Sequence, residues 1–289
     1  QKTTFIKGNA TELESAVSHK MAGDKWLINQ LLHENGIPVP FCQSFHVKEL
    51  PEALTWFCRR NRTVVVKPRR GTSGGKGVTA CISQTRDFIK AFYEAAMHDS
   101  FVLVEDYITG RNYRLLLVKD ELLGAVERIP PIVTGDGEHS LRQLIAQENA
   151  RRIAADRFPR LWPIPINTDL KLTLTEQGLN LHSIPPKGKS VPVKTICNGH
   201  QGSTVEEATR EVHESYLELS RQAMKVCKVR FCGIDIITPD IRQPAGEAGA
   251  VINEINTTPS FYGHYQATRQ QEVQPVAEKF FKILFENIE

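Results

Sequence analysis

The chain has 289 residues, of which 40% are hydrophobic and 24% are charged, and its formal net charge is +3. Such a chain is typical of a folded globular protein and is long enough for one large domain or two to three small ones. No block of like charge indicates a nucleic-acid-binding arm or a membrane-binding patch, and no run of about 18 apolar residues indicates a transmembrane helix. The six cysteines form no C-x-x-C pair and no zinc-binding spacing. We therefore expect a cytoplasmic protein with reduced thiols that are mostly small core side chains, and neither nucleic acid nor membrane as a partner.

The first half of the chain predicts helices and strands in alternation. The first helix begins after Asp24, whose side chain can cap it, and ends at Asn35-Gly36. Two apolar runs, Val64–Val66 and Val78–Ile82, predict a hairpin whose glycine-rich tip is too long for a simple turn. The next predicted elements are a helix led by Ser83 and strands at residues 101–107, 113–118 and 122–128.

The second half begins with a loop at Thr134–Gly137 and a helix that starts at a Ser140–Gln143 capping box. The proline-rich stretch 157–193 predicts an extended excursion with short strands. Residues 205–228 predict one long amphipathic helix. Two strands around residues 235 and 254 and a final helix at residues 272–285 complete the chain. Because strands and helices are mixed and the strands mostly follow one another, we expect an α+β fold with antiparallel sheets.

A glycine-rich segment, Gly71–Gly77, lies between the two strands of the predicted hairpin. Nucleotide-binding loops of the Walker and dinucleotide types are followed by a helix, whereas a strand follows here. A flexible hairpin loop can instead donate backbone N–H groups to phosphates, although a plain surface hairpin is an alternative. Lys67 ends the preceding apolar strand, where a lysine requires an anion to offset its burial. Lys25 lies at the start of the first helix, and by itself it indicates an exposed surface lysine more than a binding residue.

Two carboxylates lie on apolar strands near the C-terminus. Asp235 and Glu254 each follow alternating apolar residues, and Asn256 projects to the same face as Glu254 because it lies two residues further on. Ionised carboxylates on such a face require a cation or another partner. Carboxylate and amide oxygens suit Mg²⁺ that also binds phosphates. The alternative is an ion pair with Arg114 or Arg128.

In this combination and order, these segments resemble ATP-grasp ligases. Within that superfamily the chain from residue 20 onward is similar to the ATP-grasp portion of bifunctional glutathione synthetases and of cyanophycin synthetases. The segments that show the resemblance are Asp24-Lys25, Val64–Pro68, Gly71–Gly77, Val104–Ile108, Val133–Ser140, Glu176–Leu179, Gly233–Asp240, Gln243-Pro244 and Asn253–Asn256.

The resemblance implies an ATP-grasp fold, in which two α+β subdomains with antiparallel sheets grip ATP between them. The implied domains are a lead-in helix region at residues 1–40, a lid subdomain at residues 41–106 and a C-terminal subdomain at residues 107–289. The implied cofactors are ATP and two Mg²⁺ ions, with Mn²⁺ as a substitute. Only 24 residues precede Lys25, so we expect a further domain of a longer chain, or a homodimer, to complete the substrate surface.

The resemblance also assigns roles to individual residues. The α- and β-phosphates would be bound by Lys25 and Lys67, and the outer phosphates by the loop residues Gly71, Thr72, Ser73, Gly74, Gly75 and Gly77. Adenine would lie against Glu105, Asp106, Tyr107 and Ile108, with Asn112 at the ribose position. The metal ligands would be Asp235, Glu254 and Asn256. The γ-phosphate and the reacting acyl group would face Arg114 and Arg128.

The implied activity is an ADP-forming carboxylate–amine ligase that makes an amide or peptide bond through an acyl phosphate, on amino-acid or small-peptide substrates. The alternatives are an ATP-grasp kinase that phosphorylates a small molecule, and a nucleotide-binding module without catalysis. Residues 194–203 would help to bind the acceptor. Because they depart from the Arg-x-Asn-x-Asn pattern of the relatives, we expect a substrate pair that differs from theirs.

Overall fold

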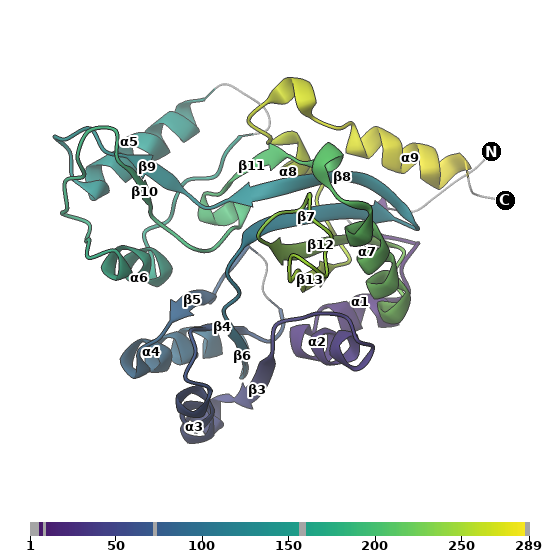
Figure 1. Ribbon diagram of the computed structural model, residues 1–289, viewed down its shortest axis with the longest axis horizontal. Helices are drawn as coiled ribbons and strands as arrows, with labels where there is room; N and C mark the ends of the chain where they lie inside the picture. Colours follow the sequence, from purple (N-terminus) through teal and green to yellow (C-terminus); the bar gives the residue numbers. More distant parts are fainter. Residues whose placement is uncertain (1–5, 8–9, 72–73, 156–159, 287–289) are drawn as a thin grey trace. The chain divides into compact units, whose positions relative to one another are not determined.

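The computed structural model describes residues 6–7, 10–71, 74–155 and 160–286 (Figure 1). By its internal contacts the chain divides into two compact units. The first unit comprises Gln1–Cys42, Ile108–Glu127 and Val205–Glu289, and the second comprises Gln43–Tyr107 and Arg128–Thr204. The three domains expected from the sequence were defined by their roles in nucleotide binding and not by internal contacts. That division of the chain stays a prediction.

The first unit is built on a five-stranded sheet with the strand order β11-β8-β7-β12-β13. Its strands are β7 (Arg111–Val118), β8 (Glu121–Ile129), β11 (Thr204–Glu207), β12 (Phe231–Thr238) and β13 (Val251–Asn256). Strand β12 pairs antiparallel with both β7 and β13. The helices of this unit are α1 (Ala16–Ala22), α2 (Lys25–Glu34), α7 (Glu214–Cys227), α8 (Tyr262–Tyr265) and α9 (Val276–Glu286). A short ribbon of β1 (Ile6–Lys7) and β2 (Ala10–Thr11) lies near the start of the chain.

Alternation along the strands gives this sheet two apolar faces. On β7, Leu115 and Leu117 pack into the core formed with α2 and α7, whereas Leu116 and Val118 pack into the core formed with α9. Strand β12 alternates in the same way, since Ile234 and Ile236 belong to the first of these cores. Asp235, which lies between them on β12, therefore points to the opposite face.

The second unit contains a four-stranded sheet with the order β3-β6-β4-β5. Its elements are β3 (Cys42–His46), α3 (Leu50–Arg60), β4 (Val64–Pro68), β5 (Thr79–Ile82), α4 (Thr85–Ala96) and β6 (Phe101–Asp106). A second apolar cluster of this unit joins β9 (Ile132–Thr134), β10 (Ser190–Pro192), α5 (Leu141–Ala154) and α6 (Thr168–Glu176). The described residues also form the 3₁₀ helices η1 (Val47–Glu49), η2 (Gly199–Gln201), η3 (Thr209–Glu211) and η4 (Gln270–Glu272).

Several predictions that depend on local chemistry are confirmed. The Asp24 side chain caps α2 by accepting a hydrogen bond from the backbone N–H of Leu27. Strands β4 and β5 form the predicted antiparallel hairpin. Ser140 and Gln143 form the predicted capping box at the start of α5. Among the described residues, none of the helices is long and apolar enough to cross a membrane.

Other predictions were wrong. The proline-rich stretch contains the helix α6, which Asn167 caps and whose Leu170 and Leu174 are buried. The predicted helix at residues 205–228 is a strand, β11, followed by the shorter helix α7, because residues 204–207 add an edge strand to the first sheet. The final helix begins at Val276 rather than Glu272. Three cysteines are buried, but Cys58 is exposed and Cys81 and Cys197 are half-buried, so the expected core role holds for only half of them.

Candidate active site

Three neighbouring strands of the first unit bring charged side chains into one row. In the strand register, Asp235 on β12 lies opposite Arg114 on β7 and opposite Glu254 on β13. Asn256 lies opposite Gly233, two pairs further along. The amide nitrogen of Asn256 lies 3.5 Å from Oδ2 of Asp235. The structure thus brings together all three predicted metal ligands and one of the two predicted catalytic arginines.

The pair of Arg114 and Asp235 is bidentate. Nε and Nη2 of Arg114 donate to Oδ1 and Oδ2 of Asp235, each at 2.6 Å, and the two side chains are only 15% and 12% exposed. Burial by itself would lower the pKa of Arg114, but the negative charges of Asp235 and Glu254 outweigh it and raise that pKa. The ion pair that the sequence left open as an alternative for Asp235 is therefore present.

A glycine makes room for this arginine. A Cβ atom on Gly233 would lie 3.3 Å from both Cδ and Nε of Arg114 and 3.2 Å from Pro259 Cβ. These distances are tighter than most real Cβ contacts, so with a larger residue Arg114 or Pro259 would have to shift by a few tenths of an ångström. The Gly-Ile-Asp sequence thus supplies both the carboxylate and the space for its partner.

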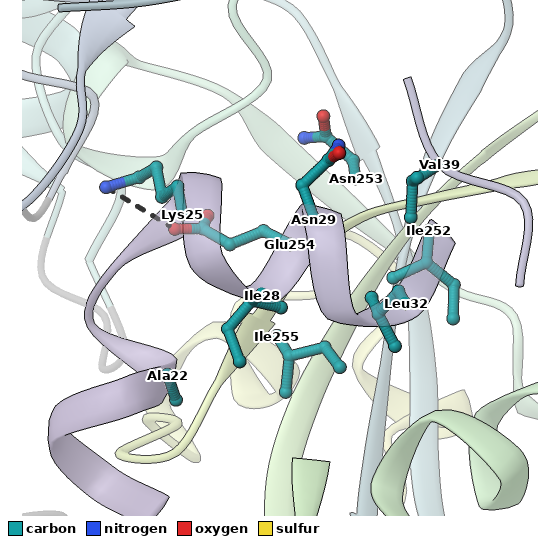
Figure 2. A pocket seen from close by; sticks show the side chains of 10 residues that line it. All are labelled: Ala22, Lys25, Ile28, Asn29, Leu32, Val39, Ile252, Asn253, Glu254 and Ile255. Atoms are coloured by element: carbon teal, nitrogen blue, oxygen red, sulfur yellow. Dashed lines mark ion pairs between the residues drawn. The ribbon is translucent and has the colours of Figure 1, made fainter. Parts of the chain in front are cut away.

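Lys25 extends the row of charges. It is the first residue of α2, and its Nζ lies 3.9 Å from Oε1 of Glu254. Figure 2 shows this ion pair at a pocket between α2 and β13, with the amides of Asn29 and Asn253 further along its wall. The site of the first unit therefore places two neighbouring carboxylates, Glu254 and Asp235, between two cations, Lys25 and Arg114.

The second unit holds a separate buried ion pair. Nζ of Lys67 on β4 lies 2.7 Å from Oε1 of Glu105 on the adjacent strand β6, and the side chains are 7% and 6% exposed. The anion that the burial of Lys67 requires is therefore present within the protein. The neighbouring carboxylate of Asp106 pairs with Arg60 and, at 3.6 Å, with Arg62.

The segment that follows Glu105 is also anchored. The backbone N–H of Tyr107 donates to the carbonyl of Thr63, and burial together with its contact to Cys81 raises the pKa of the Tyr107 hydroxyl. At Ile108 the chain passes from the second unit back into the first. The side chains of residues 105–107 are thus held by contacts within the second unit.

The glycine-rich loop adopts backbone conformations that favour glycine. Gly71, Gly74, Gly75 and Gly77 all have positive φ, between +67° and +72°. A Cβ on Gly77 would also lie 2.5 Å from the His98 ring. The predicted phosphate-binding residues Thr72 and Ser73 lie outside the described residues. The described glycines are therefore required by the backbone of the loop.

The remaining predicted residues lie at the first sheet. Asn112 lies on β7 opposite Ile237, and Arg128 is half-buried on β8, which neighbours β7 in the strand order.

Within the described part of the chain, no group of three or more His, Cys, Asp or Glu side chains is arranged to hold a metal ion. The predicted metal set contains two carboxylates and depends on Asn256 for its third protein oxygen.

A further buried ion pair, in the second unit, was missed by the sequence analysis. Lys194 and Asp169 lie 3.3 Å apart (Nζ to Oδ2), with side chains 0% and 1% exposed. Lys194 belongs to the segment 194–203 that was expected to bind the acceptor, yet its ammonium group points into the protein. Asp169 lies in the first turn of α6, and an acid there is ordinary for a helix start, so no sequence signal distinguished it.

Comparison with known proteins gives the family context. Residues 22–126 match the ATP-grasp domain. The chain is 35% identical over 248 residues to the glutathione biosynthesis bifunctional protein of Pasteurella multocida. The aligned region covers 83% of this chain and 32% of that protein. It is 30% identical over 285 residues to the cyanophycin synthetase of Trichormus variabilis, and this aligned region covers 98% of this chain and 31% of that protein. The chain thus spans about a third of the length of these relatives.

Solved structures agree with this similarity. The crystal structure of a bifunctional glutathione synthetase from Pasteurella multocida aligns with a TM-score of 0.60 and 30% identity, over 99% of this chain and 39% of that one. A D-alanine–D-alanine ligase from Bacillus anthracis aligns with a TM-score of 0.55 at 16% identity, over 96% of this chain and 69% of that one, and this likeness concerns the fold alone. The chain therefore contains an ATP-grasp domain and has the ATP-grasp fold.

Proposed function

We propose that this chain is the catalytic part of an ATP-dependent, ADP-forming carboxylate–amine ligase that acts in the cytoplasm on amino-acid or small-peptide substrates. The observation that supports this most strongly is a row of four charged side chains. Glu254, Asp235 and Arg114 lie on three adjacent strands, and Lys25 of α2 lies beside Glu254. Such a row can accept both a metal-bound triphosphate and the negative charge that develops when a carboxylate attacks it.

The donor atoms of this row fit Mg²⁺. A carboxylate has about four lone-pair sites, so the two bonds from Arg114 leave Asp235 able to accept a metal ion as well. Glu254 adds a second carboxylate, and a half-turn of the Asn256 amide presents its oxygen to the same side. Bound there, two Mg²⁺ ions would offset the charge of the phosphates.

Each of the other residues has a role in this proposal. Lys25 and Lys67 bind the inner phosphates, and the loop glycines together with Thr72 and Ser73 surround the outer ones. Residues 105–108 lie against adenine, and Asn112 contacts the ribose. The ion pair with Glu105 holds the Lys67 side chain in place on β4.

The proposed reaction proceeds in two steps. The donor carboxylate attacks the γ-phosphorus and ADP leaves, which gives an acyl phosphate. The amine then attacks the acyl carbon and phosphate leaves, which gives an amide. Arg114 and Arg128 stabilise the charge on the transferred phosphoryl group and the acyl oxygen. Exclusion of water by the glycine loop protects the acyl phosphate from hydrolysis.

The experiment that tests this proposal measures ADP release with ATP and Mg²⁺ against a matrix of carboxylate donors and amine acceptors. The matrix includes γ-glutamylcysteine with glycine and aspartyl peptides with arginine. ADP formation that requires both partners, with a product whose mass equals their condensation, supports a ligase. A stable phosphorylated product from one partner alone would instead identify a kinase.

A pair of matched variants separates catalysis from simple nucleotide binding. Glu254→Gln removes one metal ligand, and we expect ATP turnover to fall at least a hundredfold with folding retained. Glu218→Gln is the control, because Glu218 lies exposed on α7 in the same unit. Unchanged ATP turnover in Glu254→Gln would contradict the metal role.

The rest of the substrate surface is also part of the proposal. Because the chain spans about a third of its relatives, a further domain of a longer chain or a second copy is expected to complete the acceptor site. Light scattering of the active species decides between these sources. A catalytically competent monomer of this chain would argue against the dimer.

A further inference from the structure

The glycine loop rests on a segment that lies far from it in sequence, within the second unit. The carbonyl of Gly74 accepts a hydrogen bond from Nε2 of Gln201 at 3.1 Å. A Cβ on Gly74 would lie 3.1 Å from the His200 ring, and a Cβ on Gly75 would lie 3.3 Å from Cγ of Gln201. Two separate reasons therefore favour glycine at both positions. The backbone has a positive φ there, and it approaches residues 200–201 too closely for a side chain.

The Gln201 amide is oriented by buried neighbours. Nζ of Lys194, which can only donate, lies 2.6 Å from Oδ1 of Asn167, so that oxygen faces the lysine. The Nδ2 group of Asn167 then donates to Oε1 of Gln201 at 3.2 Å. This leaves Nε2 of Gln201, which is 7% exposed as a residue, to face Gly74. The charge of Lys194, balanced by Asp169, thus determines which end of the Gln201 amide meets the loop.

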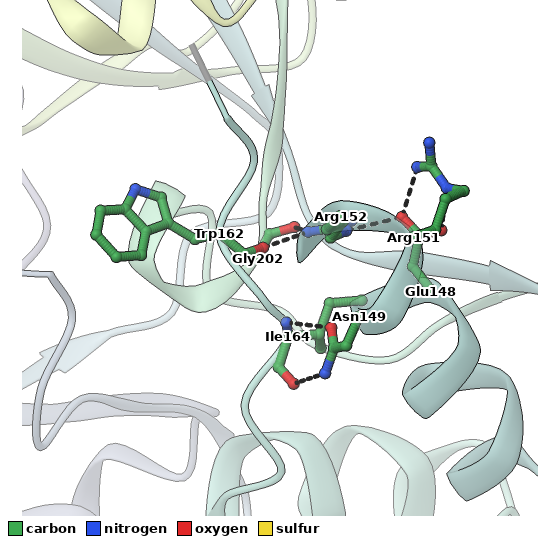
Figure 3. A network of polar contacts seen from close by, with 7 residues as sticks. All are labelled: Glu148, Asn149, Arg151, Arg152, Trp162, Ile164 and Gly202. Carbon is green, nitrogen blue, oxygen red and sulfur yellow. Dashed lines mark hydrogen bonds and ion pairs between the residues drawn. The ribbon is translucent and has the colours of Figure 1, made fainter. Parts of the chain in front are cut away.

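The turn that carries Gln201 is itself held firmly, as Figure 3 shows. The buried Arg152 donates through Nη1 to the carbonyls of Gly202 and Trp162, at 2.7 and 2.8 Å, and through Nε to Glu148. Asn149 adds two hydrogen bonds to the backbone of Ile164. Helix α5 therefore fixes both backbone segments, and Gln201 acts from a rigid support.

We infer that Gln201 is a positioning residue for the glycine loop, because it holds the Gly74 carbonyl so that the loop presents its backbone N–H groups to the phosphates of ATP. The inference rests on the proposed function for the purpose of the loop, while the contact itself can be tested without any substrate. Residues 200–201 belong to the segment that was expected to bind the acceptor, and the inference gives that segment a role toward the nucleotide.

The test uses Gln201→Leu, which keeps the size of the side chain and removes its donor. Lys76, exposed in the loop, provides a trypsin site two residues beyond Gly74. Losing one hydrogen bond corresponds to about a three- to tenfold change in an equilibrium. We therefore expect cleavage after Lys76 to become about three- to tenfold faster, as identified by the fragment masses. In ADP release, the KM for ATP should rise by a similar factor while kcat changes less than twofold.

A second variant distinguishes loss of the Gln201 contact from misfolding caused by the first substitution. Asn167→Asp keeps the cap of α6 and the acceptor for Lys194 but no longer donates to Gln201, so the amide of Gln201 loses its orientation. We expect the same faster cleavage and higher KM. Gln177→Leu is the control, because Gln177 donates to two backbone carbonyls of the same unit, those of Thr173 and Pro192.

Faster cleavage in both Gln201→Leu and Asn167→Asp, but not in Gln177→Leu, supports the inference. The inference is overturned if Gln201→Leu and Asn167→Asp are both cleaved at the rate of the unmodified chain. It is also overturned if the control Gln177→Leu is cleaved as fast as these two variants. If no donor and acceptor pair releases ADP, the proposed ligase activity fails, and proteolysis still decides whether Gln201 holds the loop.

Discussion

Replacing Asp235 by asparagine should destabilise the first unit measurably. The amide keeps one acceptor for Arg114 but turns an N–H₂ group toward the other guanidinium nitrogen, and it removes the balancing charge. Both side chains are largely inaccessible, at 15% and 12% exposure, so water replaces little of what is lost. Breaking a buried ion pair on one side costs about 3–5 kcal/mol, and hydrogen bonds to charged groups contribute about 1.5–3 kcal/mol each. Since one bond survives, we expect the free energy of unfolding to fall by about 2–3 kcal/mol.

Urea unfolding followed by tryptophan fluorescence measures this change. Of the three tryptophans, Trp26 lies in α2 of the first unit, whereas Trp56 and Trp162 lie in the second. In a background with phenylalanine at positions 56 and 162, the emission reports the unit that contains the ion pair. Asp240→Asn is the control, because Asp240 pairs with Arg242 at the surface and such pairs contribute little.

Two results would refute the reasoning. One is a change below about 1 kcal/mol in Asp235→Asn, since that would mean that water or another group replaces the lost charge. The other is an equal change in Asp240→Asn. The double variant Arg114→Met/Asp235→Asn should regain part of the lost stability, because no unbalanced charge then stays buried.

Three further predictions concern the second unit. Lys194→Met leaves the Asp169 carboxylate buried without its cation, so the free energy of unfolding, followed by the emission of Trp56 and Trp162, should fall by about 3–5 kcal/mol, and Lys194→Met/Asp169→Leu should recover much of it. Hydrogen bonds from the backbone of His139 and Glu138 lower the pKa of Asp136 from 3.8 to about 2. The stability that Asp136 adds over Asp136→Asn is therefore present above about pH 4 and should vanish in melting curves as the pH falls toward 2. Gly77→Ala should lower the melting temperature more than Gly71→Ala, because both have positive φ but only at Gly77 would the methyl group meet the His98 ring. Equal shifts would show that the ring gives way.

Much of the local structure could be predicted from the sequence. The Asp24 cap and the Ser140–Gln143 capping box each depend on residues that lie three positions apart, and the β4–β5 hairpin joins strands that follow one another in the chain. Such contacts leave a recognisable pattern in the sequence because the residues that make them are near one another in the chain. The helix α6 was missed because its support is not local, since Leu170 and Leu174 are buried against β9 and β10 and the flanking prolines indicated extended chain.

For the candidate site, the sequence by itself determined the chemical types: buried lysine, glycine loop, and carboxylates at alternate positions on apolar strands. These types follow from the burial cost of charge and from strand periodicity. Only the tertiary structure decided the partners, because a strand does not specify which distant strand lies beside it. The register joins Asp235 to Arg114 across 121 positions, β4 and β6 bring Lys67 to Glu105, and Gln201 meets Gly74 across 127 positions.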